Sequence, residues 1–196
     1  MKKLLLGAAL AVSSLTFAQQ FGVKGGVNVS NISDDNNVET NSKTGFYAGV
    51  FMNAPLAESF SIQPELLYNS VGSKYTYGDA SSTLTLDYLT LPVMFQYNVV
   101  PQFYLEAGPE FGMLLNAKAK YEGGGLSGEA DLDKDNFNSF NFGVGLGAGF
   151  NITNNIGINA RYVAGFTDAT DESNQDFGSD ASNKNNVFQA GVTFKF

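Results

Sequence analysis

Apolar residues alternate with small or polar ones along much of the chain. The clearest stretch has an apolar residue at every second position from Phe140 to Ile152, with Gly or Asn between them. A period of two places successive side chains on opposite faces of a β-strand, so this strand has one apolar and one small, polar face. Lipid-facing barrel strands show this pattern at about this length.

The same alternation recurs along the chain and predicts eight strands in all. Near the start, Phe21, Val23, Val27 and Val29 lie on the apolar face, and Lys24 lies on the polar one. Pro92 and Pro109 weaken the boundaries of two of these strands, because proline cannot donate to a strand ladder. The predicted strands are residues 21–30, 45–54, 60–71, 84–98, 102–115, 140–152, 156–166 and 187–196.

The connections between these strands alternate in length. Those at 53–59, 99–101 and 153–155 are short, whereas those at 32–44, 72–83, 116–139 and 167–186 are long and polar. Short turns on one rim and long loops on the other are typical of outer-membrane barrels. We therefore predict an all-β, eight-stranded antiparallel transmembrane β-barrel with short periplasmic turns and long extracellular loops. Because lipid cannot satisfy backbone polar groups, the strands must close into a ring.

A soluble, lipocalin-type barrel is the alternative, since it also alternates. Its apolar face points inward and its polar face meets water. Here the polar face is made of Gly, Asn, Gln and Thr with few charges, which favours a crowded interior over a solvated exterior.

Residues 1–18 have the features of a secretory signal peptide. Lys2 and Lys3 precede an apolar run of nine residues, and a Thr16-Phe17-Ala18 cleavage site follows. The apolar run is too short to span a bilayer as a helix. We expect a cleaved signal at 1–18 and one barrel domain at 19–196, located in the outer membrane of a Gram-negative cell.

Composition excludes several functions. The chain has no His and no Cys, so Ser-His and Cys-His nucleophiles, ordinary zinc sites and disulfides are absent. Its formal net charge is −8, and such an acidic chain would repel nucleic acid. We predict no enzyme activity and no cofactor.

Several short segments resemble the porin-family, PorT-like outer-membrane β-barrel domain. They are Phe21-Gly22-Val23-Lys24-Gly25-Gly26, Gly45-Phe46-Tyr47-Ala48-Gly49-Val50, Gln63-Pro64-Glu65-Leu66-Leu67-Tyr68, Tyr88-Leu89-Thr90-Leu91-Pro92-Val93 and Gly108-Pro109-Glu110-Phe111-Gly112. The closing Phe194-Lys195-Phe196 is similar to the terminal aromatic signal by which such barrels are recognised by the outer-membrane assembly machinery. The resemblance implies the fold and says very little about activity.

Five charged residues fall on the predicted inner face: Lys24, Glu65, Glu106, Glu110 and Arg161. Side chains just fill an eight-stranded barrel, and an unpaired buried charge is costly, so these groups should pair. We expect a lumenal salt-bridge plug that fixes strand register. A gated polar path or proton relay is the alternative.

The four long loops are acidic, with 14 Asp and Glu against six Lys. This composition indicates a solvated coat, with a cationic or divalent-ion partner as the functional alternative. One acidic segment, Asp131-Leu132-Asp133-Lys134-Asp135, is similar to the start of an EF-hand calcium loop. The similarity ends there, because Asn136 stands at the sixth position in place of Gly and Phe142 at the twelfth in place of Glu. A glycine-rich segment matches the dinucleotide-binding fingerprint in its letters alone, because no strand–turn–helix surrounds it. This segment is Gly143-Val144-Gly145-Leu146-Gly147-Ala148.

The sequence therefore predicts a non-enzymatic barrel in the outer-membrane bilayer, with a structural or surface-interaction role for its acidic loops. A narrow, porin-like channel for ions or small solutes is the alternative. A lipid hydrolase is a weaker one, since the missing His excludes Ser-His chemistry.

Overall fold

The computed structural model describes residues 19–33, 40–77, 80–123, 126–133, 137–168 and 184–196, so the predicted signal peptide lies outside the described residues. In this part of the chain, no helix is long and apolar enough to cross a membrane. The strands are β1 (Gln20–Ser33), β2 (Thr40–Ala57), β3 (Phe60–Tyr77), β4 (Ala80–Val100), β5 (Phe103–Gly123), β6 (Leu126–Asp131), β7 (Phe140–Asn151), β8 (Ile156–Asp168) and β9 (Lys184–Lys195).

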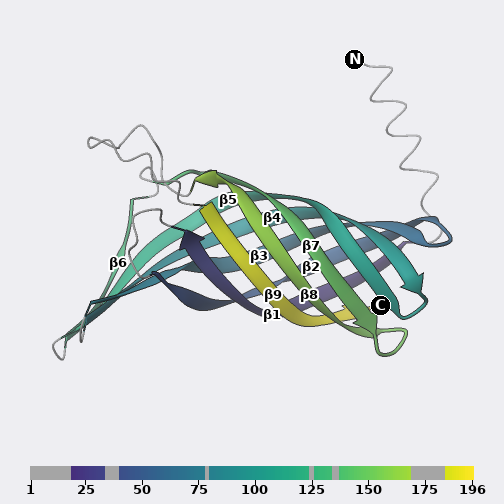
Figure 1. Ribbon diagram of the computed structural model, residues 1–196, viewed down its shortest axis with the longest axis horizontal. Helices are drawn as coiled ribbons and strands as arrows, with labels where there is room; N and C mark the ends of the chain where they lie inside the picture. The colour runs from purple at the N-terminus through teal and green to yellow at the C-terminus, as the bar shows by residue number, and fades with distance from the viewer. Residues whose placement is uncertain (1–18, 34–39, 78–79, 124–125, 134–136, 169–183) are drawn as a thin grey trace, which may run out of the picture.

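Eight of the strands form a closed ring. Their order is β4-β3-β2-β1-β9-β8-β7-β5, and β5 pairs back onto β4. Every neighbouring pair is antiparallel. Figure 1 shows the resulting tilted barrel, with the C-terminus at the end opposite β6. The predicted eight-stranded barrel is confirmed, and both Pro92 and Pro109 lie within continuous strands.

The strand β6 lies outside the ring and corrects the prediction of a loop at 116–139. Strand β5 continues to Gly123, and its outer part pairs with β6 from Lys118↔Asp131 to Gly123↔Leu126. The predicted loop at 72–83 is likewise mostly strand, since β3 and β4 pair as far as Tyr77↔Ala80. Beyond the bilayer the outer face of a strand meets water instead of lipid, so apolar–polar alternation is lost while backbone pairing continues.

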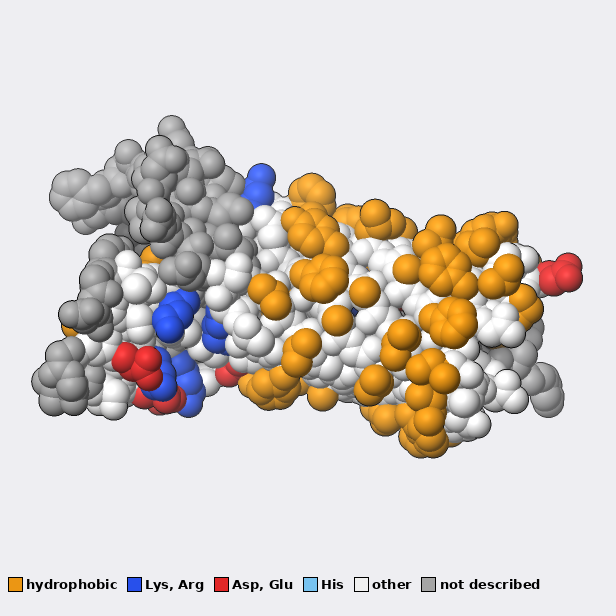
Figure 2. Space-filling view, turned by 60° about the horizontal axis from the view of Figure 1, so that its bottom comes forward, with side chains coloured by type: hydrophobic (Ala, Val, Ile, Leu, Met, Phe, Trp, Pro, Cys, Tyr) orange, Lys and Arg blue, Asp and Glu red, His pale blue; other side chains and the backbone are white. Residues whose placement is uncertain are grey.

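The outer wall of the barrel is apolar. On β1, the side chains of Phe21, Val23, Val27 and Val29 are 54%, 42%, 55% and 40% exposed, whereas Lys24 between them is buried. Figure 2 shows hydrophobic side chains spread over the wall, while Lys and acidic side chains gather mostly at the end where β6 lies. Exposed apolar surface on this scale needs a lipid environment.

Aromatic pairs lie on the outer wall beside the short turns and farther up the barrel. Phe60 and Tyr97 stack beside the short turns at 4.9 Å between ring centroids, and Phe46 and Tyr68 pair at 5.6 Å farther up the barrel. Phe60 and Tyr68 are eight residues apart on β3, about 26 Å along a strand. Because barrel strands are tilted by about 35–45°, this length spans roughly 20 Å along the barrel axis, which fits within the apolar band of about 25 Å of such barrels.

The interior changes character along the barrel axis. Buried polar and charged side chains, with Phe51, Met94 and Tyr104 among them, occupy the half near the short turns, and a buried apolar cluster lies at the outer end. Leu132 and Phe137, which follow β6, pack against this cluster. The polar inner face predicted from the sequence therefore gives way to apolar side chains at the outer end. The cluster consists of Val71, Leu86, Tyr88, Leu114, Ala117, Val163 and Val187.

Candidate functional site

A layer of four charged side chains crosses the lumen near the short-turn end. Lys24 lies on β1 and Glu106 on β5, while Glu65 lies on β3 and Arg161 on β8. In the ring of eight strands, β1 is opposite β5, and β3 is opposite β8. The four side chains therefore reach inward along two different diameters and meet across the lumen.

Arg161 is the centre of this charged layer. Its Nη1 donates to Glu65 Oε2 at 2.9 Å and its Nη2 to Glu65 Oε1 at 2.8 Å. Its Nε donates to Glu106 Oε1 at 2.8 Å. Lys24 Nζ donates to Glu65 Oε1 at 3.1 Å. All four charged groups are paired, as buried charges require, and all four residues are at most 3% exposed.

Amide side chains complete the hydrogen bonding of the two carboxylates. Gln63 Nε2 donates to Glu65 Oε1 at 2.8 Å, and Gln96 Nε2 donates to Glu106 Oε2 at 3.1 Å. Gln96 in turn accepts a hydrogen bond from Asn53 Nδ2 at 2.8 Å, nearer the short turns. Two cations and two carboxylates with these amides form a neutral, connected network, which is the condition for a buried polar cluster to be stable.

Glycines on β7 make room for the charged layer. Gly147 lies in register between Glu106 on β5 and Arg161 on β8, and a Cβ there would lie 3.0 Å from Glu106 Oε1. A Cβ on Gly149 would overlap the ring of Tyr104. The Gly-rich segment is thus a continuous strand, which agrees with the sequence argument against a dinucleotide loop.

Glu110 shares the inner face but is in none of the ion pairs. It is 7% exposed, and its Oε2 has no hydrogen-bond partner among the described residues. Asn28 Oδ1, Asn159 Nδ2 and Gln189 Oε1 are buried and unpartnered in the same sense. Buried polar atoms of this kind are normally satisfied by internal water.

The sequence predicted only part of the charged layer. The structure places Lys24, Glu65, Glu106 and Arg161 together and leaves Glu110 apart. Sequence reasoning did not assign Gln96 and Asn53 to the site, although both are polar residues at inward positions of apolar strands. Phe194 and Phe196, the predicted assembly signal, are exposed on the outer wall with ring centroids 5.7 Å apart.

Within the predicted acidic loops, charges of both signs pair on the β5–β6 hairpin. Lys118 Nζ donates to Glu129 Oε1 at 3.0 Å, and Lys120 Nζ lies 2.7 Å from Glu122 Oε1. These contacts lie outside the apolar band, and the hydrogen bond to Glu129 raises the pKa of Lys118. Among the described residues no His, Cys, Asp or Glu group is arranged to hold a metal ion, and residues 134–136 of the EF-hand-like segment lie outside them.

Comparison with known proteins identifies the family. Residues 17–171 match the family model described as an outer membrane protein beta-barrel domain, so the chain belongs to that family. No curated protein sequence matches the chain.

Solved structures show the same fold at low sequence identity. The chain is similar to Ail, the attachment invasion locus protein of Yersinia pestis, with a TM-score of 0.55, 13% identity, and 92% of this chain and 100% of Ail covered. It is also similar to Neisserial surface protein A, with a TM-score of 0.53 and 14% identity. That match covers 91% of this chain and 99% of Neisserial surface protein A. The protein is therefore an outer-membrane β-barrel.

Proposed function

We propose that the protein is a closed, non-enzymatic barrel that anchors an acidic interaction surface on the outside of the cell. The observation that carries this proposal is that side chains fill the lumen at two levels along the barrel axis. The charged layer around Arg161 crosses it near the short turns, and the apolar cluster around Leu86 fills the outer end. A barrel filled at two levels is suited to a structural role, and its contacts are made outside the bilayer.

A cationic partner fits the charge of the extracellular segments. The four long connections carry 14 acidic residues against six Lys, and on the β5–β6 hairpin both Lys118 and Lys120 are already paired with carboxylates. One Ail structure is a complex with the heparin analogue sucrose octasulfate, which is a polyanion. The extracellular segments of the present chain carry a net negative charge, which would repel such a ligand, so we expect them to favour polycations instead.

The test uses charge variants of the full-length protein refolded into lipid nanodiscs. One variant carries Glu122→Gln, Glu129→Gln and Asp131→Asn on the hairpin, and a second replaces residues 169–183, which include four acidic residues, with a short Gly-Ser linker. Surface plasmon resonance against an oligo-lysine peptide should show salt-sensitive binding that both variants weaken. Glu58→Gln, at the opposite end, is the matched control.

Binding of sucrose octasulfate without binding of oligo-lysine would contradict the acidic-surface proposal. So would oligo-lysine binding that the two extracellular variants leave unchanged. Both variants keep Leu132 and Phe137, so the apolar cluster retains its cover and the barrel should fold.

A narrow channel is the second candidate. The unpartnered polar atoms of Asn28, Asn159, Gln189 and Glu110 favour it, since they imply water inside the barrel. For ions to pass through the lumen, both the charged layer and the apolar cluster would have to open. Conductance of the folded barrel in a planar bilayer distinguishes the channel from the closed anchor.

Two finer assignments also belong to the proposal. The resemblance to porin-family, PorT-like barrels is one of them. Recognition of Phe194 and Phe196 by the assembly machinery is the other, and exposure of both rings on the outer wall supports it. Replacing both residues by Ser should leave less folded barrel in the outer membrane of expressing cells than in wild type.

A further inference from the structure

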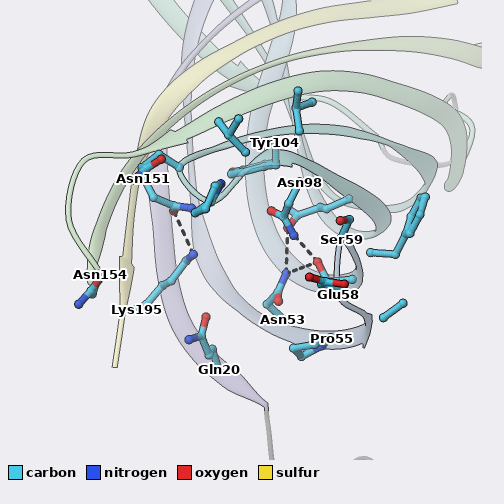
Figure 3. Close-up of a pocket in the computed structure, with 18 of the residues that line it drawn as sticks. Gln20, Asn53, Pro55, Glu58, Ser59, Asn98, Tyr104, Asn151, Asn154 and Lys195 are labelled. Carbon is cyan, nitrogen blue, oxygen red and sulfur yellow. Dashed lines mark hydrogen bonds between the residues drawn. The ribbon is translucent and has the colours of Figure 1, made fainter.

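A cavity of about 720 Å³ opens at the short-turn end of the barrel. Residues of all three turns, which connect β2 to β3, β4 to β5 and β7 to β8, line it together with the ends of β1 and β9. Figure 3 shows side chains from these separate elements around the opening. The volume lies within the usual range for small-ligand sites, roughly 300–1,000 Å³. In this fold the short turns face the periplasm, so the cavity opens to that compartment.

The inner end of the cavity is closed and ordered. Asn53 Nδ2 donates to Ser61 Oγ at 3.0 Å and to Gln96 Oε1 at 2.8 Å. Gln96 then donates to Glu106 in the charged layer. Asn53, Ser61 and Gln96 are each at most 9% exposed. A ligand entering from the periplasm would therefore meet a fixed polar floor, and the cavity is a blind pocket.

The walls of the cavity are rich in uncharged hydrogen-bonding groups. Seven of its twenty lining residues carry amide side chains, among them Gln20, Asn98, Gln102 and Asn154 near the rim. Each amide offers two donors and one acceptor, which matches ligands with many hydroxyl and amide groups. Tyr104, whose ring packs against Gly149, also lines the cavity, but it is only 6% exposed and belongs to the closed inner end.

The charges of the cavity balance and select against an ionic ligand. Lys195 and Glu58 are its two charged lining residues, and Figure 3 shows them on different sides of Asn53. The ammonium of Lys195 already donates to Asn151 Oδ1 at 3.0 Å. An anionic or cationic ligand would gain at most one opposite charge here, whereas a neutral one can use the amides at the rim.

We propose that this vestibule binds the end of an uncharged oligosaccharide of two or three sugar units presented from the periplasm. Amides and hydroxyls at the rim would hold its hydroxyl and N-acetyl groups, and Tyr104 and the floor side chains would close the inner end of the site. This site is at the opposite end from the acidic surface and does not depend on that proposal.

The test is a titration of the refolded full-length protein with triacetylchitotriose in zwitterionic amine-oxide micelles, which contain no sugar. Backbone amide shifts in ¹H–¹⁵N spectra should change saturably, with the changes confined to the three turns and the strand ends around the cavity. The double variant Asn98→Ala/Gln102→Ala should raise the Kd by about tenfold, since two hydrogen-bonding side chains are lost. Neither side chain belongs to the floor network, so folding should be retained.

The matched control is Asn138→Ala, which removes an amide at the other end of the barrel and should leave the Kd unchanged. Absence of saturable shifts with the wild-type protein would overturn the proposal, as would a Kd that the Asn98/Gln102 variant leaves unaltered. Trialanine is the competing probe. If it binds more tightly and loses affinity in Lys195→Gln and Glu58→Gln, the ligand class is a zwitterionic peptide and the oligosaccharide assignment is wrong.

Discussion

Arg161 and Glu65 form a two-pronged ion pair across the full width of the barrel, with Nη1 and Nη2 of Arg161 2.9 and 2.8 Å from the two carboxylate oxygens. Their strands, β8 and β3, are opposite each other in the ring. This pair therefore ties together two walls that share no backbone hydrogen bonds. Because Arg161 also holds Glu106 and Glu65 also holds Lys24, one guanidinium connects four strands.

Removing Arg161 should destabilise the barrel strongly. Arg161→Ala leaves Glu106 without a cation and Glu65 with Lys24 alone, inside a buried layer. Breaking a buried ion pair in this way costs about 3–5 kcal/mol. Urea-induced unfolding in micelles measures the loss. The control Lys118→Ala breaks an exposed pair on the hairpin and should have little effect. Equal effects of the two substitutions would show that the lumenal network does not stabilise the fold.

Gly149 should tolerate no side chain, because the Tyr104 ring occupies the space of its Cβ. Gly149→Ala should lower the free energy of unfolding by about 1–3 kcal/mol, as overpacking does. Gly128→Ala on β6 adds the same methyl group where nothing lies within 4 Å and is the matched control. If the overlap is the cause, Tyr104→Ala should cost less in the Gly149→Ala background than in wild type.

The apolar cluster at the outer end should contribute as much stability as a soluble core of similar size. Leu86 is fully buried there, and Leu86→Ala should cost about 2–5 kcal/mol in the same unfolding measurement. Tyr121→Ala, on the exposed part of the hairpin, should stay within about 0.5 kcal/mol of wild type. A negligible effect of Leu86→Ala would mean that the outer end of the lumen is loosely packed.

The orientation of the barrel is testable by cysteine labelling, since the chain has no Cys of its own. Gly128→Cys on β6 should react with a membrane-impermeant maleimide in intact cells. Asn154→Cys, in the turn between β7 and β8, should react only after the outer membrane is permeabilised. The reverse pattern would place the short turns outside and would also move the proposed sugar site to the cell surface.

The ring itself could be predicted from sequence because lipid outside and polar groups inside impose a period of two on every spanning strand. The same reasoning failed where that contrast ends. Residues 73–77 and 126–131 are strands, but both of their faces lie beyond the bilayer, so polarity gives no alternation there. Val71 and Leu86 were missed for a related reason, since apolar residues on the inner face do not follow the pattern of a polar lumen.

The partners within the charged layer could not be predicted, because they depend on the shear and closure of the ring. Glu65 and Arg161 are 96 residues apart in the chain. Glu106 and Glu110 face inward on the same strand, and four residues of strand separate them by about 13 Å. Only one of them can lie at the height of Arg161, and the alternation pattern alone does not show which.

The closed lumen is the central claim, and single-channel conductance in a planar bilayer tests it most directly. Barrels shown to be folded by their heat-modifiable mobility should be electrically silent, because the charged layer and the apolar cluster both fill the lumen. Steady, reproducible openings of the wild-type barrel that change with Glu65→Gln or Glu106→Gln would contradict the claim and establish a lumenal path for ions.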